Sequence, residues 1–375
     1  MPDNETSRIP AIPPELVGLI VEHIPDNISL KACCLASAKF REPSQRRLLN
    51  TIELASGSGF LSPDIEKPRS VADASMRFAE APYLLRYITK VTIHLPTSAA
   101  EWREDKDAVH LILRAAAAAR LSFLRLDCDP MVRTSNIDEP DHAAGILDEL
   151  LRALRPDHSL TLMIKGLRLS LSTFRKTFAA ASNLILSHTA VRHYDEESRL
   201  ETSMLLPIRT RTFCAYAYSN ILAVLGRPEN RHLIGNAVFL TIHSLVGGNA
   251  SDLQDVSIVC AAAKRLANLT MSVRKHTPTP RFTPFPTLRK VTFRFLGRVT
   301  DAIPKFNAMI EPFLSVAKAL EFLVLVIQMV AGDSPAVALL PPDAELIRQL
   351  DASFAAHGRL RESRGQIWKR SSRVS

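Results

Sequence analysis

Short apolar runs typical of β-strands alternate with amphipathic helical runs along most of the chain. The strand candidates cover residues 87–95, 121–127, 160–164, 237–243, 266–273, 288–295 and 320–327. The helix candidates between them cover residues 107–120, 143–154, 172–181, 252–264 and 307–319. Strands that alternate with helices favour a mainly parallel sheet covered by helices. The pattern therefore predicts an α/β fold, or α+β overall once a helical N-terminal segment is included.

Several strand candidates share a leucine-rich spacing, with apolar residues at the first, fourth and sixth positions. The copies are Leu121/Leu124/Leu126, Leu266/Leu269/Met271, Leu288/Val291/Phe293, Leu320/Leu323/Leu325 and, more loosely, Ile88/Val91/Ile93. Neighbouring copies recur after 33, 22 and 32 residues, whereas leucine-rich repeats run about 20 to 29. We therefore expect an irregular, leucine-rich-repeat-like solenoid. A doubly wound α/β domain is the alternative, although no glycine-rich phosphate loop follows any strand.

Three segments between these elements have a composition of their own. Residues 56–70 contain two glycines and two prolines and read as a loop. Residues 277–286 contain four prolines and predict an extended connector, with Phe282 and Phe285 packed beneath it. Residues 188–229 are mixed, and the apolar run 213–225 within them is expected to be helical.

The N-terminal fifty residues predict three short helices. The first begins near Pro14, because proline suits a first helical turn, and Pro25-Asp26-Asn27 ends it. Its apolar residues Leu16, Leu19, Ile20 and Ile24 share one helical face. Ser29 is the expected cap of the second helix, and Pro43-Ser44 opens a third, shorter one. Helices this short must pack on one another and on a partner.

Segment Ile12 to Leu54 resembles an F-box, in a version closest to F-box proteins abundant in mushroom-forming fungi. The family pattern is Leu-Pro-x-Glu-Leu, then a hydrophobic helix, a Leu-x-x-Cys/Leu-x-Leu-Val helix and an aromatic residue. This chain has Ile12-Pro13-Pro14-Glu15-Leu16, then Leu30, Cys33-Cys34-Leu35 and Phe40. It departs from the pattern at Ile12, at Ala36, where valine is common, and at Phe40, where tryptophan is usual.

The resemblance implies a substrate-recognition adaptor of an SCF-type cullin-RING ubiquitin ligase. Its implied contacts to the Skp-family adaptor, or core residues, are Pro13, Leu16, Ile20, Leu30, Leu35 and Phe40. The implied organisation is an F-box-like domain at 8–55, a linker followed by a helix at 56–86, a repeat-like domain at 87–355 that binds a protein target, and a basic tail at 356–375. Such an adaptor has no active site of its own. The alternatives for the three helices are a structural cap or a helix-turn-helix DNA reader that uses Arg46 and Arg47.

The net charge of +9 comes mostly from one end of the chain. The last seventeen residues carry six basic residues and one acid, a net of +5, so the other 358 share only +4. The body therefore shows no charge pattern that calls for a nucleic-acid partner. We expect a solvated basic tail.

No catalytic or metal-binding motif stands out in the sequence. The eleven histidines never form His-x-x-x-His, and neither Cys-x-x-Cys nor Gly-x-Ser-x-Gly occurs. No catalytic, cofactor-binding or metal-ligating residue is therefore assigned. His94 and His243 are expected to be hydrogen-bonded strand histidines. An α/β enzyme remains an alternative, since the members of a catalytic triad need not be close in sequence.

The cysteines and the apolar runs predict an intracellular protein, cytoplasmic or nuclear or both. The five cysteines are scattered and odd in number, as suits a reducing compartment. The N-terminus lacks the pattern of a signal peptide. The strongest apolar run, residues 322–327, is far shorter than the roughly twenty residues that span a bilayer. No membrane partner is expected.

Overall fold

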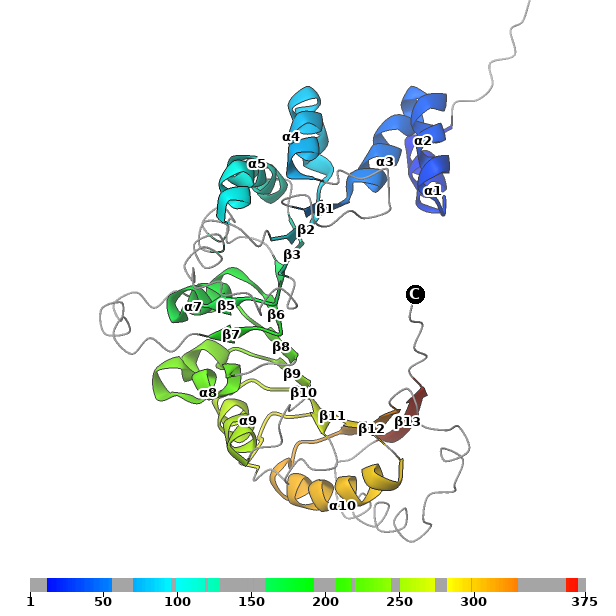
Figure 1. Cartoon of the computed structure of the whole chain (residues 1–375). Coiled ribbons are helices and arrows are strands. Elements are labelled where there is room, and N and C mark those ends of the chain that lie inside the picture. The colour runs from blue at the N-terminus through cyan, green and yellow to red at the C-terminus, as the bar shows by residue number, and fades with distance from the viewer. Residues whose placement is uncertain are drawn as a thin grey trace, which may run out of the picture. The chain divides into compact units, whose positions relative to one another are not determined.

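The chain divides into two compact units, which are described separately (Figure 1). Unit 1 comprises residues 1–124 with 153–158, and unit 2 comprises residues 125–152 with 159–375. The computed structural model describes residues 12–55, 70–95, 99–118, 121–128, 147, 151, 159–191, 207–216, 220–243, 250–273, 282–297, 299–329 and 362–369. It is a mixed α/β structure with a large, mostly parallel sheet. The domain boundaries expected from the sequence stay predictions.

Unit 1 begins with three helices, as expected. They are α1 (Pro14–Glu22), α2 (Asn27–Ala36) and α3 (Ala38–Leu49), and both α1 and α2 pack against α3. Val17, Val21 and Leu30 are buried between them. The guanidinium of Arg47 on α3 donates a hydrogen bond to the carbonyl of Val21 on α1. The carbonyl of Val21 also accepts from the backbone N–H of Ile24, so the bond from Arg47 ties α3 to the last turn of α1.

Two of the expected helix starts are wrong. The side chain of Asp26, not Ser29, caps α2 by accepting a hydrogen bond from the Ser29 N–H at 2.8 Å. Helix α3 begins at Ala38 with Ser37 as its cap, and Pro43 lies inside it. A proline at the sixth helical position removes one backbone hydrogen bond but does not prevent the helix from forming. At twelve residues, α3 is longer than α1 or α2.

The rest of unit 1 places helices around a parallel strand pair. Its elements are β1 (Thr51–Ala55), α4 (Val71–Glu80), the 3-10 helix η1 (Pro82–Tyr87), β2 (Lys90–His94) and α5 (Ala99–Ala118). Strands β1 and β2 are parallel, with Thr51 opposite Lys90. Strand β3 (Phe123–Asp127) begins in this unit and ends in unit 2. Strand β1 is absent from the sequence expectation because its five residues follow a helix with no turn signal between them.

Unit 2 contains a parallel sheet whose strand order follows the chain. The order is β4 (Thr161–Lys165), β6 (Asn183–Ser187), β8 (Thr212–Tyr216), β9 (Phe239–His243), β10 (Asn268–Val273), β11 (Lys290–Leu296), β12 (Phe322–Met329) and β13 (Glu362–Lys369). A doubly wound sheet would reverse its strand order at a switch point. The described strands of unit 2 show no such reversal.

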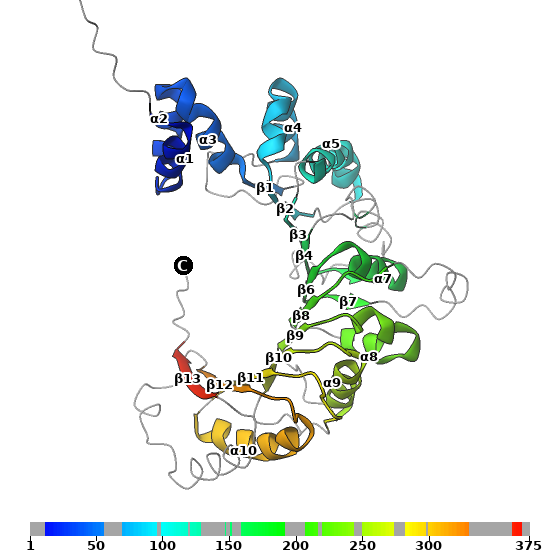
Figure 2. The same ribbon diagram turned by 180° about the vertical axis from the view of Figure 1, so that it is seen from behind.

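The helices of unit 2 lie along one face of this sheet in both views (Figures 1 and 2). They are α7 (Leu171–Ala180), α8 (Ile221–Gly226), the 3-10 helix η4 (Pro228–Ile234), α9 (Ala250–Ala262) and α10 (Val299–Val316). A fully buried column crosses the strands at Leu162, Leu184, Phe213, Leu240, Leu269, Val291 and Leu323. Because the described helices cover only one face, this buried column marks that face. The alternate residues of each strand lie on the other.

The strand register sets the spacing along unit 2. Register partners at the strand starts are Thr161, Asn183, Thr212, Phe239, Asn268, Lys290 and Phe322, so successive strands begin 22, 29, 27, 29, 22 and 32 residues apart. The expected Leu-x-x-Leu-x-Leu copies of this unit supply β10, β11 and β12. Strands β6, β8 and β9 have Ala181, Thr210 and Ala237 at the first position, all fully buried. The leucine-rich form has a large apolar residue at this position, so two small alanines and one threonine make these three copies difficult to recognise in the sequence.

A tight turn joins β4 to a second, two-stranded parallel sheet made of β5 (Arg168–Leu169) and β7 (Ala190–Val191). Gly166 in this turn has φ +78°, and an added Cβ would lie 2.1 Å from the carbonyl oxygen of Cys128. Only glycine meets both demands. The buried Thr189 donates to the carbonyls of Ile164 and Ser187, at 3.2 and 3.0 Å, and so ties the ends of β4 and β6 together.

Other sequence expectations differ from the structure in detail. The run 213–225 forms strand β8 and then helix α8, not one helix. Residues 362–369 of the expected solvated tail form β13, since charge alone does not prevent edge pairing. Helix α10 starts before the expected 307 and includes two prolines. Phe285 is buried against Phe313 of α10, as expected for the connector. Of the expected helix 143–154, only residues 147 and 151 are described.

Candidate functional site

Exposed large apolar side chains gather on the N-terminal helices of unit 1. Six of the eleven described in the chain lie within the first 36 residues: Ile12, Leu16, Leu19, Ile20, Ile28 and Leu35. We call these six the apolar set. Leu16 is 50% exposed and Leu35 is 86% exposed. Exposed apolar patches are common at binding sites for other proteins, so the apolar set is a candidate surface.

The apolar face expected on α1 is not the face that packs. Val17 and Val21 are buried, whereas Leu16, Leu19 and Ile20 are exposed. The two sets lie on adjacent stripes of one helix. The packing of α1 against α3 therefore uses the valines and leaves the leucine and isoleucine stripe free for a partner.

The six residues assigned from the family resemblance fall into two groups. Pro13, Leu16, Ile20 and Leu35 are exposed. Leu30 is 2% exposed and belongs to the core between the helices, and Phe40 is half-buried. The resemblance alone did not distinguish contact residues from core residues. Leu19 and Ile28 belong to the same exposed group and were not assigned.

Arg47 has a structural role that bears on the DNA-reader alternative. Its guanidinium is engaged with Val21, so it is not free to contact a base or a phosphate without loosening α1. Arg46 is exposed and lies 3.7 Å from Glu42, one helical turn earlier on the same helix. Of the two arginines that suggested a DNA-binding protein, Arg47 therefore joins α3 to α1, and Arg46 forms an exposed ion pair.

A second candidate surface is the helix-free face of the unit 2 sheet, here called the strand face. Along its carboxyl-end row, register partners run Lys165–Ser187–Tyr216–His243 and Ser272–Arg294. A hydrogen bond of 2.8 Å between His243 Nδ1 and Ser272 Oγ joins the two halves. Six neighbouring strands, β4, β6, β8, β9, β10 and β11, therefore carry polar side chains in one line.

An aromatic stack lies in the middle of this row. The rings of Tyr216 and His243 are parallel within 9°, with centroids 4.4 Å apart. Burial, and secondarily the charge of Arg294, lowers the pKa of His243 to about 4. Burial, aided by the hydrogen bond with Cys214, raises the pKa of Tyr216 to about 12. Both side chains are therefore neutral at pH 7.

The thiol of Cys214, two positions before Tyr216 on β8, is not an activated nucleophile. Burial raises the pKa of Cys214, against smaller opposing effects of hydrogen bonds with Tyr216 and Thr241. A thiol reacts as its thiolate, so a raised pKa makes it inert at neutral pH. The cluster of Cys214, Tyr216 and His243 can donate and accept hydrogen bonds and offer aromatic area.

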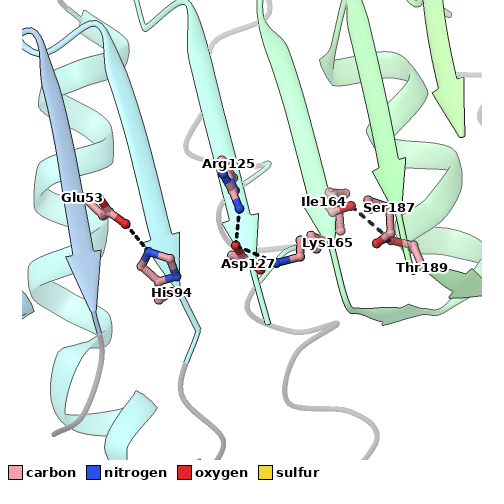
Figure 3. A network of polar contacts seen from close by, with 8 residues as sticks. All are labelled: Glu53, His94, Arg125, Asp127, Ile164, Lys165, Ser187 and Thr189. Atoms are coloured by element: carbon pink, nitrogen blue, oxygen red, sulfur yellow. Dashed lines mark hydrogen bonds and ion pairs between the residues drawn. The ribbon is translucent and has the colours of Figure 1, made fainter. Parts of the chain in front are cut away.

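At the other end of the row, two cations share one buried carboxylate (Figure 3). Lys165 Nζ lies 3.0 Å from Asp127 Oδ1, and Arg125 donates to Asp127 Oδ2. Only 8% of the Asp127 side chain is exposed. A buried carboxylate is stable when cations and hydrogen bonds compensate its charge, so Asp127 has a structural explanation within unit 2.

Unit 1 has a comparable polar pair on its two strands. His94 Nε2 of β2 lies 2.6 Å from Glu53 Oε1 of β1 (Figure 3). His243 and His94 thus both have hydrogen-bond partners, as the sequence predicts for strand histidines. Among the described residues, no cluster of three or more histidine, cysteine or acidic side chains is arranged to hold a metal ion.

The chain matches no protein-family model and no curated protein. Within the described part of the chain, no helix has the length and apolar character needed to cross a membrane.

Proposed function

We propose that this protein is a substrate-recognition adaptor of an SCF-type cullin-RING ubiquitin ligase. In this proposal the apolar set of α1 and α2 docks on a Skp-family adaptor, and the strand face of unit 2 binds a protein target. Catalysis would then take place on other subunits, and the adaptor would act by holding the target near them.

The observation that carries the proposal is the exposure of the apolar set. A chain that folded alone would gain free energy by turning these side chains inward, at about 25 cal/mol per Å² of apolar surface. The F-box resemblance was drawn from residue spacing. The exposure of Pro13, Leu16, Ile20 and Leu35 is a separate property of the fold, and it supports the docking role for four of the six residues.

The arrangement of unit 2 supports a leucine-rich-repeat-like target domain. Parallel strands follow one another in chain order and the described helices lie on one face. Five of the seven strand intervals fall between 22 and 29 residues, and the intervals to β12 and β13 are 32 and 40 residues. Solenoid repeats stack in this way, and they present a continuous surface for binding.

A double substitution tests the docking role. The Leu16→Ala/Ile20→Ala variant should bind a purified fungal Skp-family protein about tenfold or more weakly than the unchanged protein, since truncating buried interface anchors commonly costs more than 1 kcal/mol each. Both side chains are exposed, so circular dichroism should show an unchanged fold. Isothermal titration calorimetry with the full chain measures the affinity.

The matched control is Leu111→Ala on α5. Leu111 has the same exposure as Leu16, 50%, but lies outside the apolar set, and its truncation should leave Skp binding unchanged. If the unchanged protein shows no binding at micromolar concentration, or if both variants lose binding equally, the adaptor proposal is wrong.

A further inference from the structure

The strand face of unit 2 carries Arg294, for which the described residues provide no ion pair. Arg294 of β11 lies between the fully buried Phe293 and Phe295, so its side chain projects to the strand face. Its Nε atom is buried and has no hydrogen-bond partner among the described residues. Leaving a buried donor unpaired is unfavourable, and more so when it belongs to a charged group.

The contrast with Lys165 and Arg125 shows what is missing. Those two cations, on the same face, have Asp127 between them. The Nε atom of Arg125 is, like that of Arg294, buried without a hydrogen-bond partner among the described residues, so the difference between the two arginines is the carboxylate. Strands β6, β8, β9, β10, β11 and β12 contain no aspartate or glutamate, and their only charged residues are Lys290 and Arg294. This part of the strand face is therefore positive, with no carboxylate of its own strands to neutralise it.

The neighbours of Arg294 are suited to a peptide. Its register partner is Ser272, and its positive charge acts on both Tyr216 and His243. Thr241, Thr270 and Thr292 form the adjacent column of the same face. Beyond that column lie the exposed Lys290 and Phe239, the latter 47% exposed. Aromatic area, hydroxyl groups and one desolvated guanidinium are typical of protein-binding surfaces.

We propose that the strand face binds an acidic, extended segment of a target protein, and that a carboxylate of this segment pairs with Arg294, in the row that also holds Tyr216 and His243. Arginine suits this role because its planar donors match a carboxylate in a two-pronged hydrogen bond. This inference deepens the proposed function, on which it rests for the identity of the ligand as a ligase target. A nucleic acid is less suited, since tight binding to a phosphate backbone requires several cations.

Peptide selection against the intact protein tests the inference. A random twelve-residue display library should yield binders that contain aspartate or glutamate. Their affinity, measured by fluorescence anisotropy with the synthetic peptide, should fall about tenfold or more with Arg294→Gln, as for loss of a charge-assisted hydrogen bond. Changing the peptide's acidic residues to their amides should cause a comparable loss.

The matched control is Arg289→Gln. Arg289 is exposed and directly precedes β11, so this variant loses the same charge close by in sequence without touching Arg294. Peptide affinity should be unchanged. If Arg294→Gln does not fold by circular dichroism, Arg294→Lys retains the charge but not the two-pronged geometry and should show a smaller loss.

Three results would overturn the inference: no enrichment of acidic peptides, acidic binders that Arg294→Gln leaves unaffected, or binding of a dT12 oligonucleotide that depends on Arg294 where peptides do not bind. The failure of the adaptor proposal is separately visible. If the unchanged protein does not bind the Skp-family protein, the adaptor proposal fails while the peptide affinities can still be measured. If no acidic peptide binds, the further inference fails while Skp binding can still be measured.

Discussion

His243 shows how the strand face controls the protonation of a single side chain. The imidazole stacks on Tyr216, bonds to Ser272 and lies within electrostatic reach of Arg294. These neighbours offer no negative charge to stabilise an imidazolium, so burial dominates and the neutral ring is favoured.

The depressed pKa of His243 predicts a pH-dependent stability. Its pKa is about 4 in the folded protein and 6.5 as the reference for the unfolded chain, so the unfolded state binds the extra proton between these values. The stability from this group is fully present above pH 6.5 and is lost as the pH falls towards 4. The free energy of unfolding in urea should therefore fall less between pH 7 and pH 5 for His243→Gln than for the unchanged protein.

The control for this measurement is His232→Gln, which removes an exposed histidine of η4 and keeps His243. It should retain the pH dependence of the unchanged protein. Equal slopes for His243→Gln and the unchanged protein would contradict the burial argument.

At the scale of the element, helix α7 depends on a residue far along the chain. The hydroxyl of Thr210 donates to the carbonyls of Phe178 and Ala181, both at 3.0 Å, at the C-terminal end of α7. Thr210 is fully buried, so water cannot replace these bonds. A helix end that the sequence marks only weakly is thus completed by the segment that leads into β8.

The Thr210→Val variant should therefore destabilise unit 2. It keeps the shape of the side chain but removes the donor. The carbonyl of Phe178 keeps the backbone N–H groups of Arg209 and Thr210, whereas leaving the buried carbonyl of Ala181 unpaired costs about 1 to 3 kcal/mol. Urea unfolding at pH 7 measures the change. Thr212→Val is the matched control, because Thr212 is only half-buried on β8, a strand in which valine is well accepted; equal losses in the two variants would refute the capping role.

At the scale of the whole molecule, the two proposals assign separate tasks to different residues. The apolar set is uncharged and belongs to unit 1, and the Arg294 neighbourhood is cationic and belongs to unit 2. In the proposals, the apolar set binds its partner by burying apolar side chains. The neighbourhood of Arg294 binds its partner by pairing a positive charge with a carboxylate.

Because the two surfaces share no residues, their variants should act independently. Combining Leu16→Ala/Ile20→Ala with Arg294→Gln should reduce Skp binding as the first change does alone, and peptide binding as the second does alone. Calorimetry with Skp and anisotropy with an acidic peptide measure the two affinities. Loss of Skp binding in Arg294→Gln alone would contradict the separation.

Local signals in the sequence determined the alternation of strands and helices and the three N-terminal helices. Periodicity, prolines and capping residues act within a few positions, so the stretch from Pro14 to Leu49 and strands such as β10 and β12 could be predicted from neighbours alone. The strands β6 and β8 were not predicted, and the run 213–225, which contains most of β8, was expected to be helical.

Only the tertiary structure decided which apolar residues of α1 are buried and which row of the strand face holds Arg294, for which the described residues provide no ion pair. Val17 and Val21 are covered because α3 packs on their stripe, and Leu16 and Ile20 are left exposed by the same contact. Arg294 lies in one row with Tyr216 and His243, two strands from His243 and three from Tyr216, because the register aligns strands that begin tens of residues apart. Burial and pairing are set by neighbours in space, and no local pattern in the sequence specifies those.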